Sequence, residues 1–365
     1  MPRCPTCGTI YPADARFCTR DGTRLLASAT PGAPVATATD TPRSTSALQR
    51  GEGSAPAVTH ASLAGKTLQG RYLVERKIGE GGMSFVYLAT DVSTRERYAI
   101  KVLSAALSQD ANAMARLRRE ASLGMRLAHP NVCHIIRLGE TEDGLVYVVM
   151  PFVDGEILAD RTNRLGQISL ADAVPLVRDM AIGLNVAHEL KIVHRDLKPE
   201  NIMVCRREGR DIAVVMDFGL AKERKAGAEL QKLTATGIIL GTPEFMSPEQ
   251  LRGKPLDART DIYSLALMTY EMLTSKLPFQ GRTQQELMIA RLRSDPTPLR
   301  KMRPDLDFPE SVERVLLKAM ARNPDERFQS TIEFSDAFAA AASEGKGGSG
   351  ESNGGDGLLG KLFGR

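Results

Sequence analysis

The sequence predicts an α+β protein of two lobes, in which a small, mainly β lobe is followed by a larger α-helical lobe. The 365 residues leave room for one large domain of roughly 250 to 300 residues with small appendages. From about residue 70, short apolar runs typical of strands follow one another, and after Asp154-Gly155 apolar residues recur at helix spacing instead. A small cysteine-bearing segment precedes both lobes.

Changes in composition divide the chain into four parts. Residues 1–26 form a compact segment marked by Cys and Gly, and residues 27–69 carry Ala, Thr, Pro, Ser and Gly with almost no large apolar side chains, which is typical of a flexible linker. Residues 70–342 form the two-lobed domain. Residues 343–365 form a Gly/Ser-rich tail that ends in a short apolar and basic tip.

The overall composition excludes several classes of protein. Hydrophobic residues make up 42% of the chain and charged residues 25%, and a net charge of +4 is too small to indicate nucleic acid, so no nucleic-acid partner is expected. No stretch reaches the 18 or more apolar residues of a membrane span, and the start lacks the apolar core of a signal peptide. We therefore expect a cytoplasmic protein without a transmembrane segment.

The small lobe is expected to contain four strand-like runs, at residues 71–77, 85–89, 98–103 and 145–149, and one helix over about 110–127. The apolar residues of this helix would pack on the lobe: Met114, Leu117, Ala121 and Met125. In the larger lobe, Ser169 and Asp172 offer a capping box. A long helix follows them, with apolar residues at helix spacing: Val174, Val177, Ala181, Leu184 and Ala187. One further helix is expected to begin near Asp261, and a last helix is expected to span about residues 331–342.

A glycine-rich turn lies between the first two strands. Gly79, Gly81 and Gly82 lack the Cβ that would hold a ligand away, so backbone N–H groups there can approach phosphates closely, and Ser84 is a small residue that still permits this approach. Val86, just after the turn, would pack on a nucleobase. Short glycine loops also occur by chance, so this turn is weak evidence when taken alone.

Lys101 closes an alternating strand, where its ammonium could reach phosphates if an acid held its flexible side chain. Glu120, on the basic helix, is the best candidate for that acid. Without the other motifs, the favoured interpretation would be a surface lysine and a solvated glutamate.

The most specific string runs from His194 to Asn201 and places a carboxylate, an ammonium and a carboxamide in one short loop. Asp196 would accept or orient the proton of an acceptor hydroxyl, and Lys198 would neutralise charge on a transferring phosphoryl group. Asn201 and Asp217 would hold Mg²⁺, which prefers oxygen ligands and retained water. The alternative is a coincidental polar turn.

Together these residues resemble the serine/threonine protein kinases, and more closely the bacterial members, whose glycine loops often read as residues 81–84 do here. The resemblance covers about residues 70–340. It implies the two-lobed protein-kinase fold, ATP and Mg²⁺ as cofactors with Mn²⁺ as an alternative metal, and transfer of phosphate to Ser or Thr hydroxyls of protein substrates in bacterial signalling. Lys198 and Thr242, the latter in the substrate-side loop, resemble the Ser/Thr rather than the Tyr branch.

The resemblance also assigns residues to nucleotide binding and to support. In the hinge, Met150 is similar to a gatekeeper, and Pro151 departs from the usual Glu but keeps the backbone carbonyl that can read an adenine together with the Val153 N–H. Glu249 is expected to pair with Arg327, and Asp261 to anchor the backbone of the loop that contains Arg195. The full set expected to bind ATP is Ile78, Gly79, Gly81, Gly82, Ser84, Val86, Ala99, Lys101, Met150, Pro151 and Val153.

The segment between Asp217 and Glu249 suggests regulation. Thr234 and Thr236 lie among basic residues, and a phosphothreonine with about −1.5 to −2 charges could dock at Arg195. We therefore predict activation by autophosphorylation at Thr236 and Thr234. The resemblance to bacterial kinases also implies a homodimer in which one chain phosphorylates the other in trans. Thr242 is expected to be structural, near Asp196. The alternative is a polar loop with incidental threonines.

The N-terminal segment resembles a zinc ribbon. Cys4, Cys7 and Cys18 carry the spacing of metal ligands, and Asp21 stands where such a module has its fourth Cys. Three thiolates and a carboxylate can complete a tetrahedral Zn²⁺ site, which so short a segment would need in order to fold. Because basic and aromatic residues are few, a protein partner is expected. A degenerate ribbon and a redox role for Cys4 and Cys7 are the alternatives.

Two other functions compete with an active kinase. A pseudokinase scaffold would bind partners without transferring phosphate, but it has no need for Lys101, Glu120, Asp196, Asn201 and Asp217 together. A zinc-ribbon adaptor would make the N-terminal module primary and the large domain its effector.

Overall fold

The computed structural model describes residues 63–81, 84–104, 108–218 and 243–344, without the side chains of residues 111–113, 116, 120 and 243. The predicted zinc ribbon, most of the predicted linker, the segment with Thr234 and Thr236, and the C-terminal tip lie outside these ranges. No helix among the described residues is long and apolar enough to cross a membrane.

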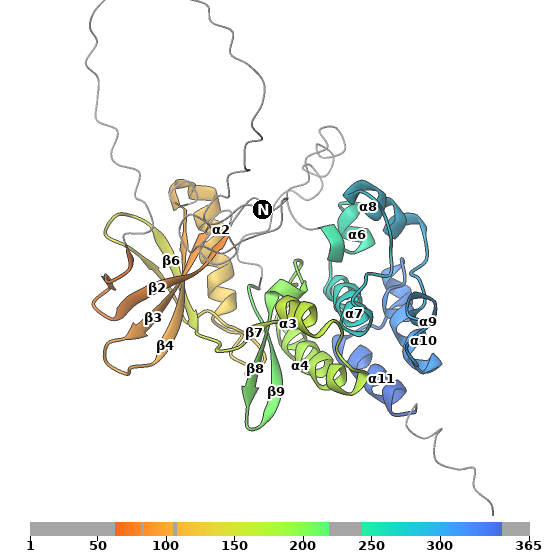
Figure 1. Ribbon diagram of the computed structural model, residues 1–365. Coiled ribbons are helices and arrows are strands. Elements are labelled where there is room, and N and C mark those ends of the chain that lie inside the picture. The colour runs from red at the N-terminus through yellow and green to blue at the C-terminus, as the bar shows by residue number, and fades with distance from the viewer. Residues whose placement is uncertain (1–62, 82–83, 105–107, 219–242, 345–365) are drawn as a thin grey trace, which may run out of the picture. The chain divides into compact units, whose positions relative to one another are not determined.

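The first part of the described chain forms a six-stranded antiparallel sheet in the order β1-β2-β3-β4-β6-β5. Its strands are β1 Thr67–Leu68, β2 Tyr72–Gly81, β3 Ser84–Asp91, β4 Arg97–Leu103, β5 Arg137–Glu140 and β6 Val146–Pro151. Helix α2, Ala111–Gly124, lies beside this sheet (Figure 1). The predicted small β lobe with one helix is therefore present.

Two details of this lobe differ from the sequence-based expectations. Leu63 is 1% exposed and β1 pairs with β2, so the residues from 63 onward belong to the domain and not to a linker that extends to residue 69. Isolated leucines among Gly and Thr carry no periodicity, so the sequence did not reveal them. Met125 is 44% exposed, because α2 ends at Gly124 and the helical spacing that would bury Met125 stops there.

The second part is mainly helical. A three-stranded antiparallel sheet of β7 Glu156–Ile157, β8 Ile202–Arg207 and β9 Arg210–Val215 begins it. The helices are α3 Leu158–Leu165, α4 Leu170–Glu189, α6 Pro248–Leu251, α7 Ala258–Thr274, α8 Gln284–Arg293, α9 Leu299–Met302, α10 Glu310–Ala319 and α11 Thr331–Glu344, with short 3₁₀ turns η2 Pro199–Asn201, η3 Pro243–Phe245 and η4 Pro324–Glu326. Helix α4 packs against α7, α11 and β9 (Figure 1).

Local chemistry explains where the main helices begin. The Ser169 hydroxyl accepts a hydrogen bond from the Asp172 N–H at 3.2 Å, which satisfies one of the free donors in the first turn of α4. Asp257 caps α7 in the same way, and nearly every residue of α7 is buried because other elements surround this helix. Helix α7 thus forms the centre of the larger core, on which the loops of the site are held.

The two parts of the domain meet through backbone contacts. The Cys133 N–H donates to the Val215 carbonyl, and the Val215 N–H donates to the Asn131 carbonyl, so the segment after α2 is joined to β9. Gly155, between β6 and β7, lies so close to β8 that an added Cβ would sit 2.5 Å from the Val204 carbonyl oxygen. The chain can cross between the lobes at this point only because residue 155 is glycine.

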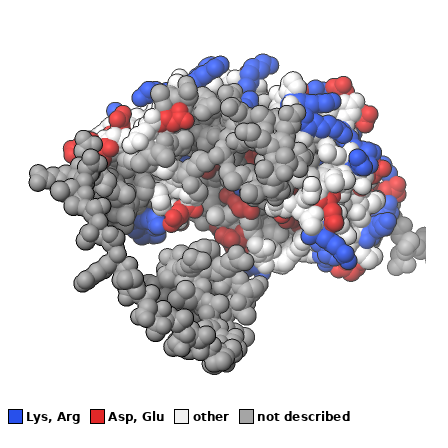
Figure 2. Space-filling view, turned by 90° about the horizontal axis from the view of Figure 1, so that it is seen from above, with Lys and Arg blue, Asp and Glu red and all other residues white. Residues whose placement is uncertain are grey.

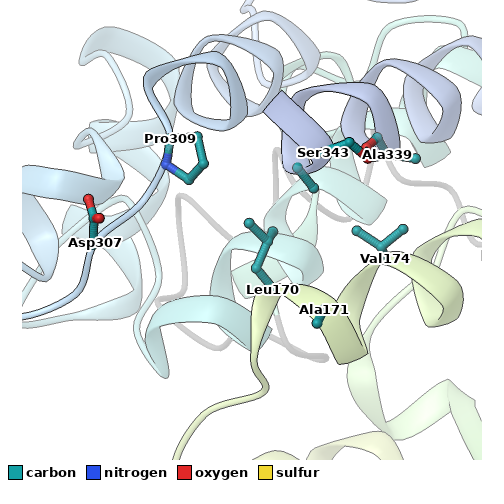
Figure 3. Close-up of a pocket in the computed structure, with 8 residues that line it drawn as sticks. Leu170, Ala171, Val174, Asp307, Pro309, Ala339 and Ser343 are labelled. Carbon is teal, nitrogen blue, oxygen red and sulfur yellow. Dashed lines mark hydrogen bonds between the residues drawn. The ribbon is translucent and has the colours of Figure 1, made fainter. Parts of the chain in front are cut away.

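Neither the surface charge nor the pocket described below marks the predicted site. Figure 2 shows Lys and Arg side chains spread over the right-hand part of one face with Asp and Glu side chains between them. A pocket of about 330 Å³ opens where Leu170 and Val174 of α4 face Ala339 and Ser343 of α11 (Figure 3). None of the predicted site residues lines this pocket.

Candidate functional site

The loop that follows α4 is held by one buried carboxylate. Asp261 of α7 is fully buried and accepts hydrogen bonds from the N–H groups of His194 at 2.8 Å and Arg195 at 3.0 Å, and from the His188 ring at 2.7 Å. Burial by itself would raise the pKa of Asp261, but these donors favour the charged form and leave its pKa below the ordinary value. Asp261 therefore fixes the loop backbone as expected.

The loop backbone is strained where it turns toward the reactive residues. Arg195 has a φ of 66° and Asp217 a φ of 52°, in the left-handed region that non-glycine residues rarely adopt. Such conformations persist where the surrounding contacts determine them, and they concentrate at functional sites. Arg195 lies next to Asp196, and Asp217 is itself a predicted magnesium ligand.

Asp196, Lys198 and Asn201 converge within this loop. The Asn201 amide nitrogen donates to the backbone oxygen of Asp196 at 2.8 Å and to its carboxylate at 3.3 Å. The Lys198 ammonium lies 3.9 Å from the same carboxylate. Because the amide nitrogen of Asn201 is used in this way, its carboxamide oxygen remains as the atom that can bind a cation.

Lys101 and Asp217 join the two lobes across 116 residues of sequence. The Lys101 ammonium lies 2.8 Å from the Asp217 carboxylate, and their side chains are 17% and 39% exposed. The Met216 N–H donates to the Asn201 carbonyl, which places Asp217 directly after a residue bound to the loop of residues 194–201. Lys101 of β4, Asp217 and the loop that contains Asn201 therefore lie together in one group, which we call the site group.

His194 and Phe218 lie close to Asp196 and Asp217 in the chain and contact each other. The His194 Nδ1 accepts from the Asp196 N–H at 3.3 Å, so its Nε2 carries the hydrogen and donates to the Met216 carbonyl at 2.8 Å. The Phe218 ring meets the His194 ring edge to face at 4.9 Å. These contacts tie the segments before Asp196 and after Asp217 together.

The predicted nucleotide residues line the first lobe beside the site group. Gly79 pairs with Val86, Gly81 pairs with Ser84, and Ala99 pairs with Met150 across β2, β3, β4 and β6. Val86 is half-buried, and Met150 and Val153 are buried. Ile78 lies within β2, before the glycine residues, and is 37% exposed.

Cys133, between α2 and β5, contacts the hinge, and the sequence analysis missed it. Its thiol contacts the Pro151 carbonyl at 3.7 Å, the oxygen that was expected to read an adenine. Burial raises the pKa of Cys133 to about 12, with a further rise from Asp217 and an opposing effect of Lys101, so the thiol stays neutral. A single internal cysteine carries no sequence signal for such a place.

These residues fit ATP and Mg²⁺. The donor set of one carboxylate, Asp217, and one carboxamide oxygen, Asn201, suits a cation that keeps water and phosphate oxygens as its other ligands. Among the described residues, no group of three or more His, Cys, Asp and Glu side chains is placed to hold a metal ion by itself.

Several predicted residues remain untested because they lie outside the described residues. Glu120 lies in α2, but its side chain is not described, so the expected pairing with Lys101 stays a prediction. The roles predicted for the following residues also stay predictions, because these residues lie outside the described ranges: Cys4, Cys7, Cys18, Asp21, Gly82, Thr234, Thr236 and Thr242. The expected partners Glu249 and Arg327, by contrast, are in contact at 2.8 Å.

Sequence reasoning also missed residues that support the loop from outside the motifs. The Gln250 amide donates to the Arg195 carbonyl at 2.7 Å, and His188 holds Asp261 from the last turn of α4. Neither lies at a recognisable motif spacing from its partner. Only the fold brings them together.

Glu271 of α7 provides a test of the electrostatics near the loop. Burial, and then the negative charges of Glu200 and Glu244, raise its pKa to about 7. Its folded-state pKa thus lies above the unfolded value, so its charge destabilises the fold as the pH rises from about 4.5 through 7. We expect Glu271→Gln to raise the free energy of unfolding at pH 8 by about 1 to 3 kcal/mol and to change it little at pH 4.5.

The measurement is urea unfolding at both pH values. The control is Glu326→Gln, because Glu326 is exposed. A gain at pH 8 no larger than that of the control would contradict the raised pKa.

Three comparisons with known proteins agree on the class of this chain. The family model for the protein kinase domain matches residues 72–338. Serine/threonine-protein kinase pkn3 of Myxococcus xanthus is 38% identical over 271 residues, which is 74% of this chain and 50% of that protein. Serine/threonine-protein kinase PknB of Mycolicibacterium smegmatis is 39% identical over 270 residues, 73% of this chain and 42% of that protein. The chain therefore spans about half the length of these relatives or less.

The fold has solved counterparts. The crystal structure of the Mycobacterium tuberculosis PknI kinase domain is 28% identical and matches with a TM-score of 0.58 over 76% of this chain and 98% of that chain. The matched share corresponds to the two lobes described above. The comparisons cover the part of the chain that carries every motif of the site.

Proposed function

The chain belongs to the protein kinase domain family, and on that premise we propose that it is an active serine/threonine protein kinase that transfers the γ-phosphoryl group of ATP to hydroxyls of bacterial signalling proteins. The observation that carries this proposal is the 2.8 Å contact of Lys101 with Asp217 beside the Asp196–Asn201 loop. Use of ATP implies a cytoplasmic location.

Each residue of the site has a stated task in this proposal. Asp196 accepts the proton of the acceptor hydroxyl, and Lys198 faces the negative charge that builds up during transfer. Lys101 holds nucleotide phosphates, with Glu120 as its second partner, and Asn201 and Asp217 hold Mg²⁺. When bound, ATP with Mg²⁺ supplies the phosphoryl group and the positive charge that offsets it. The glycine turn, Val86, Met150, Pro151 and Val153 enclose the nucleotide.

The first test is transfer of radiolabelled phosphate from ATP and Mg²⁺ to the purified chain and to a generic acceptor protein. We expect label with the wild type and a loss of at least about a hundredfold with Lys101→Met, because the phosphates lose their positioning ammonium. Lys301→Met, an exposed lysine on α9, is the control and should keep full activity. ATP binding without any label would favour a pseudokinase scaffold instead.

Activation by autophosphorylation extends the proposal. We expect mass spectrometry to find phosphate on Thr234 or Thr236 of the wild type, and the Thr234→Ala/Thr236→Ala double variant to transfer less phosphate to the acceptor. Mixing inactive and active chains tests transfer in trans within a dimer, and Thr242 keeps a structural task near Asp196. Full activity of the double variant would remove the switch from the proposal.

The N-terminal segment is proposed to be a zinc ribbon that binds a protein partner. Spacing and ligand chemistry support a site of Cys4, Cys7, Cys18 and Asp21. We expect about one zinc per chain by elemental analysis and a loss of it in Cys4→Ser/Cys7→Ser, while Cys205→Ser, a buried cysteine of the domain, keeps it. Zinc content equal in both variants would argue against this site.

A further inference from the structure

Arg291 is an unusual residue for the interior of a protein. It lies in α8, where it alone is buried, and its exposed fraction is 0%. Arginine is seldom fully buried unless its guanidinium finds acceptors, because loss of water around a charge is costly. Burial accordingly lowers the pKa of Arg291, while Tyr263 and Glu244 act in the opposite direction. Its contacts should explain why a charge is kept here.

The guanidinium of Arg291 binds the backbone of the segment before α6. It donates to the Met246 carbonyl at 3.1 Å and, at close range, to the Glu244 carbonyl. Its central carbon lies 5.7 Å from the centre of the Phe279 ring. The planar guanidinium can bind two acceptors at once in fixed directions, which an ammonium cannot do.

A second helix completes this attachment. The carbonyl of Phe245, between the two that Arg291 binds, accepts a hydrogen bond at 2.8 Å from the hydroxyl of Ser264, a buried residue of α7. Three consecutive carbonyls, of residues 244 to 246, are therefore each bound by a side chain from α7 or α8. Such side-chain bonds fix the conformation of a short irregular segment.

The segment held in this way is joined to the catalytic loop. Ser247 follows it and caps α6, whose Gln250 donates to the Arg195 carbonyl next to Asp196. The segment also follows Thr242, which the family resemblance places in the loop that faces the acceptor protein. A shift of residues 244 to 246 would move the acceptor surface relative to Asp196.

We propose that Arg291 is a positioning residue, which holds the segment of residues 244 to 246 so that the acceptor protein docks correctly against Asp196. The inference rests on the proposed kinase function and deepens it. It assigns to α8 a task in acceptor binding that is separate from nucleotide binding, because the Arg291 guanidinium binds the backbone of residues 244 and 246 and lies against Phe279.

The kinetic test uses the full chain with Arg291→Met, Arg291→Lys and a matched control, Arg293→Met, an exposed arginine two residues further along α8. We expect Arg291→Met to raise the KM for the acceptor by about tenfold, the equivalent of one lost hydrogen bond, with the KM for ATP unchanged within twofold. Arg291→Lys should fall between, because an ammonium keeps the charge and can still donate hydrogen bonds but lacks the rigid planar fork that holds both carbonyls in fixed directions. Arg293→Met should behave as wild type. An unchanged KM for the acceptor, or an equal rise of both KM values, would overturn the proposal.

Hydrogen exchange provides a readout that does not need activity. Amides of residues 244–251 should exchange at least about tenfold faster in Arg291→Met than in wild type, while amides of α4 keep their rates. If wild type transfers no phosphate, the proposed function fails, but this measurement still decides whether Arg291 holds the segment. Should Arg291→Met not fold, Arg291→Lys and Ser264→Ala replace it, and unchanged exchange and acceptor KM in both would refute the role.

Discussion

Asp196→Asn is expected to reduce phosphoryl transfer by roughly a hundredfold to ten-thousandfold, the range found for the loss of a positioned general base. The amide keeps the size of the carboxylate, and the backbone oxygen that Asn201 binds is unchanged, so the loop should keep its shape. What is lost is the negative charge that faces Lys198 at 3.9 Å and accepts the proton of the acceptor hydroxyl. Transfer is measured with radiolabelled ATP, and nucleotide affinity is measured separately by calorimetry.

The control for this change is Asp143→Asn, because Asp143 is half-exposed and lies 3.9 Å from Lys66, outside the site. It should leave both transfer and nucleotide affinity unchanged. Unchanged nucleotide affinity in Asp196→Asn would show that the loss concerns the chemical step. A variant that keeps more than about a tenth of wild-type transfer would exclude Asp196 as the base.

Glu249→Gln is expected to cost about 3 to 5 kcal/mol of unfolding free energy, because it leaves the buried Arg327 without its charged partner. The two side chains are 7% and 0% exposed, and each of the two terminal guanidinium nitrogens lies 2.8 Å from a carboxylate oxygen. The Thr260 hydroxyl also donates to Glu249 at 2.9 Å. Burial opposes the charge of Glu249, yet Arg327 and Thr260 keep its pKa below the ordinary value.

Chemical denaturation measures this cost, and Asp295→Asn provides the comparison. Asp295 pairs with Arg322 at the surface, where the side chains are 84% and 43% exposed, so its loss should cost less than about 1 kcal/mol. The double variant Glu249→Met/Arg327→Met should recover part of the stability lost in Glu249→Gln, since neither charge is then buried alone. Equal costs for Glu249→Gln and Asp295→Asn would contradict the assignment of a buried pair.

Spacing along the chain predicted the parts of this protein that depend on near neighbours. The eight residues from His194 to Asn201 place Asp196, Lys198 and Asn201 in one loop whatever the rest of the fold does. The Ser169 cap and the apolar face of α4 follow from contacts three or four residues apart. The failures have two causes: Met125 lies just past the end of the periodic pattern of α2, and Leu63 stands in a stretch that carries no periodicity.

Distant contacts were accessible to the sequence only where a family resemblance supplied them, as for Glu249 and Arg327. Nothing in the spacing of Lys101 and Asp217 says that they lie 2.8 Å apart, and nothing around Arg291 predicts a buried guanidinium on two carbonyls. The sequence by itself therefore determined the chemical groups, their order and the local elements that carry them. Only the tertiary structure decided which of those groups meet, because the contact of residues far apart in the chain depends on how all the intervening elements pack.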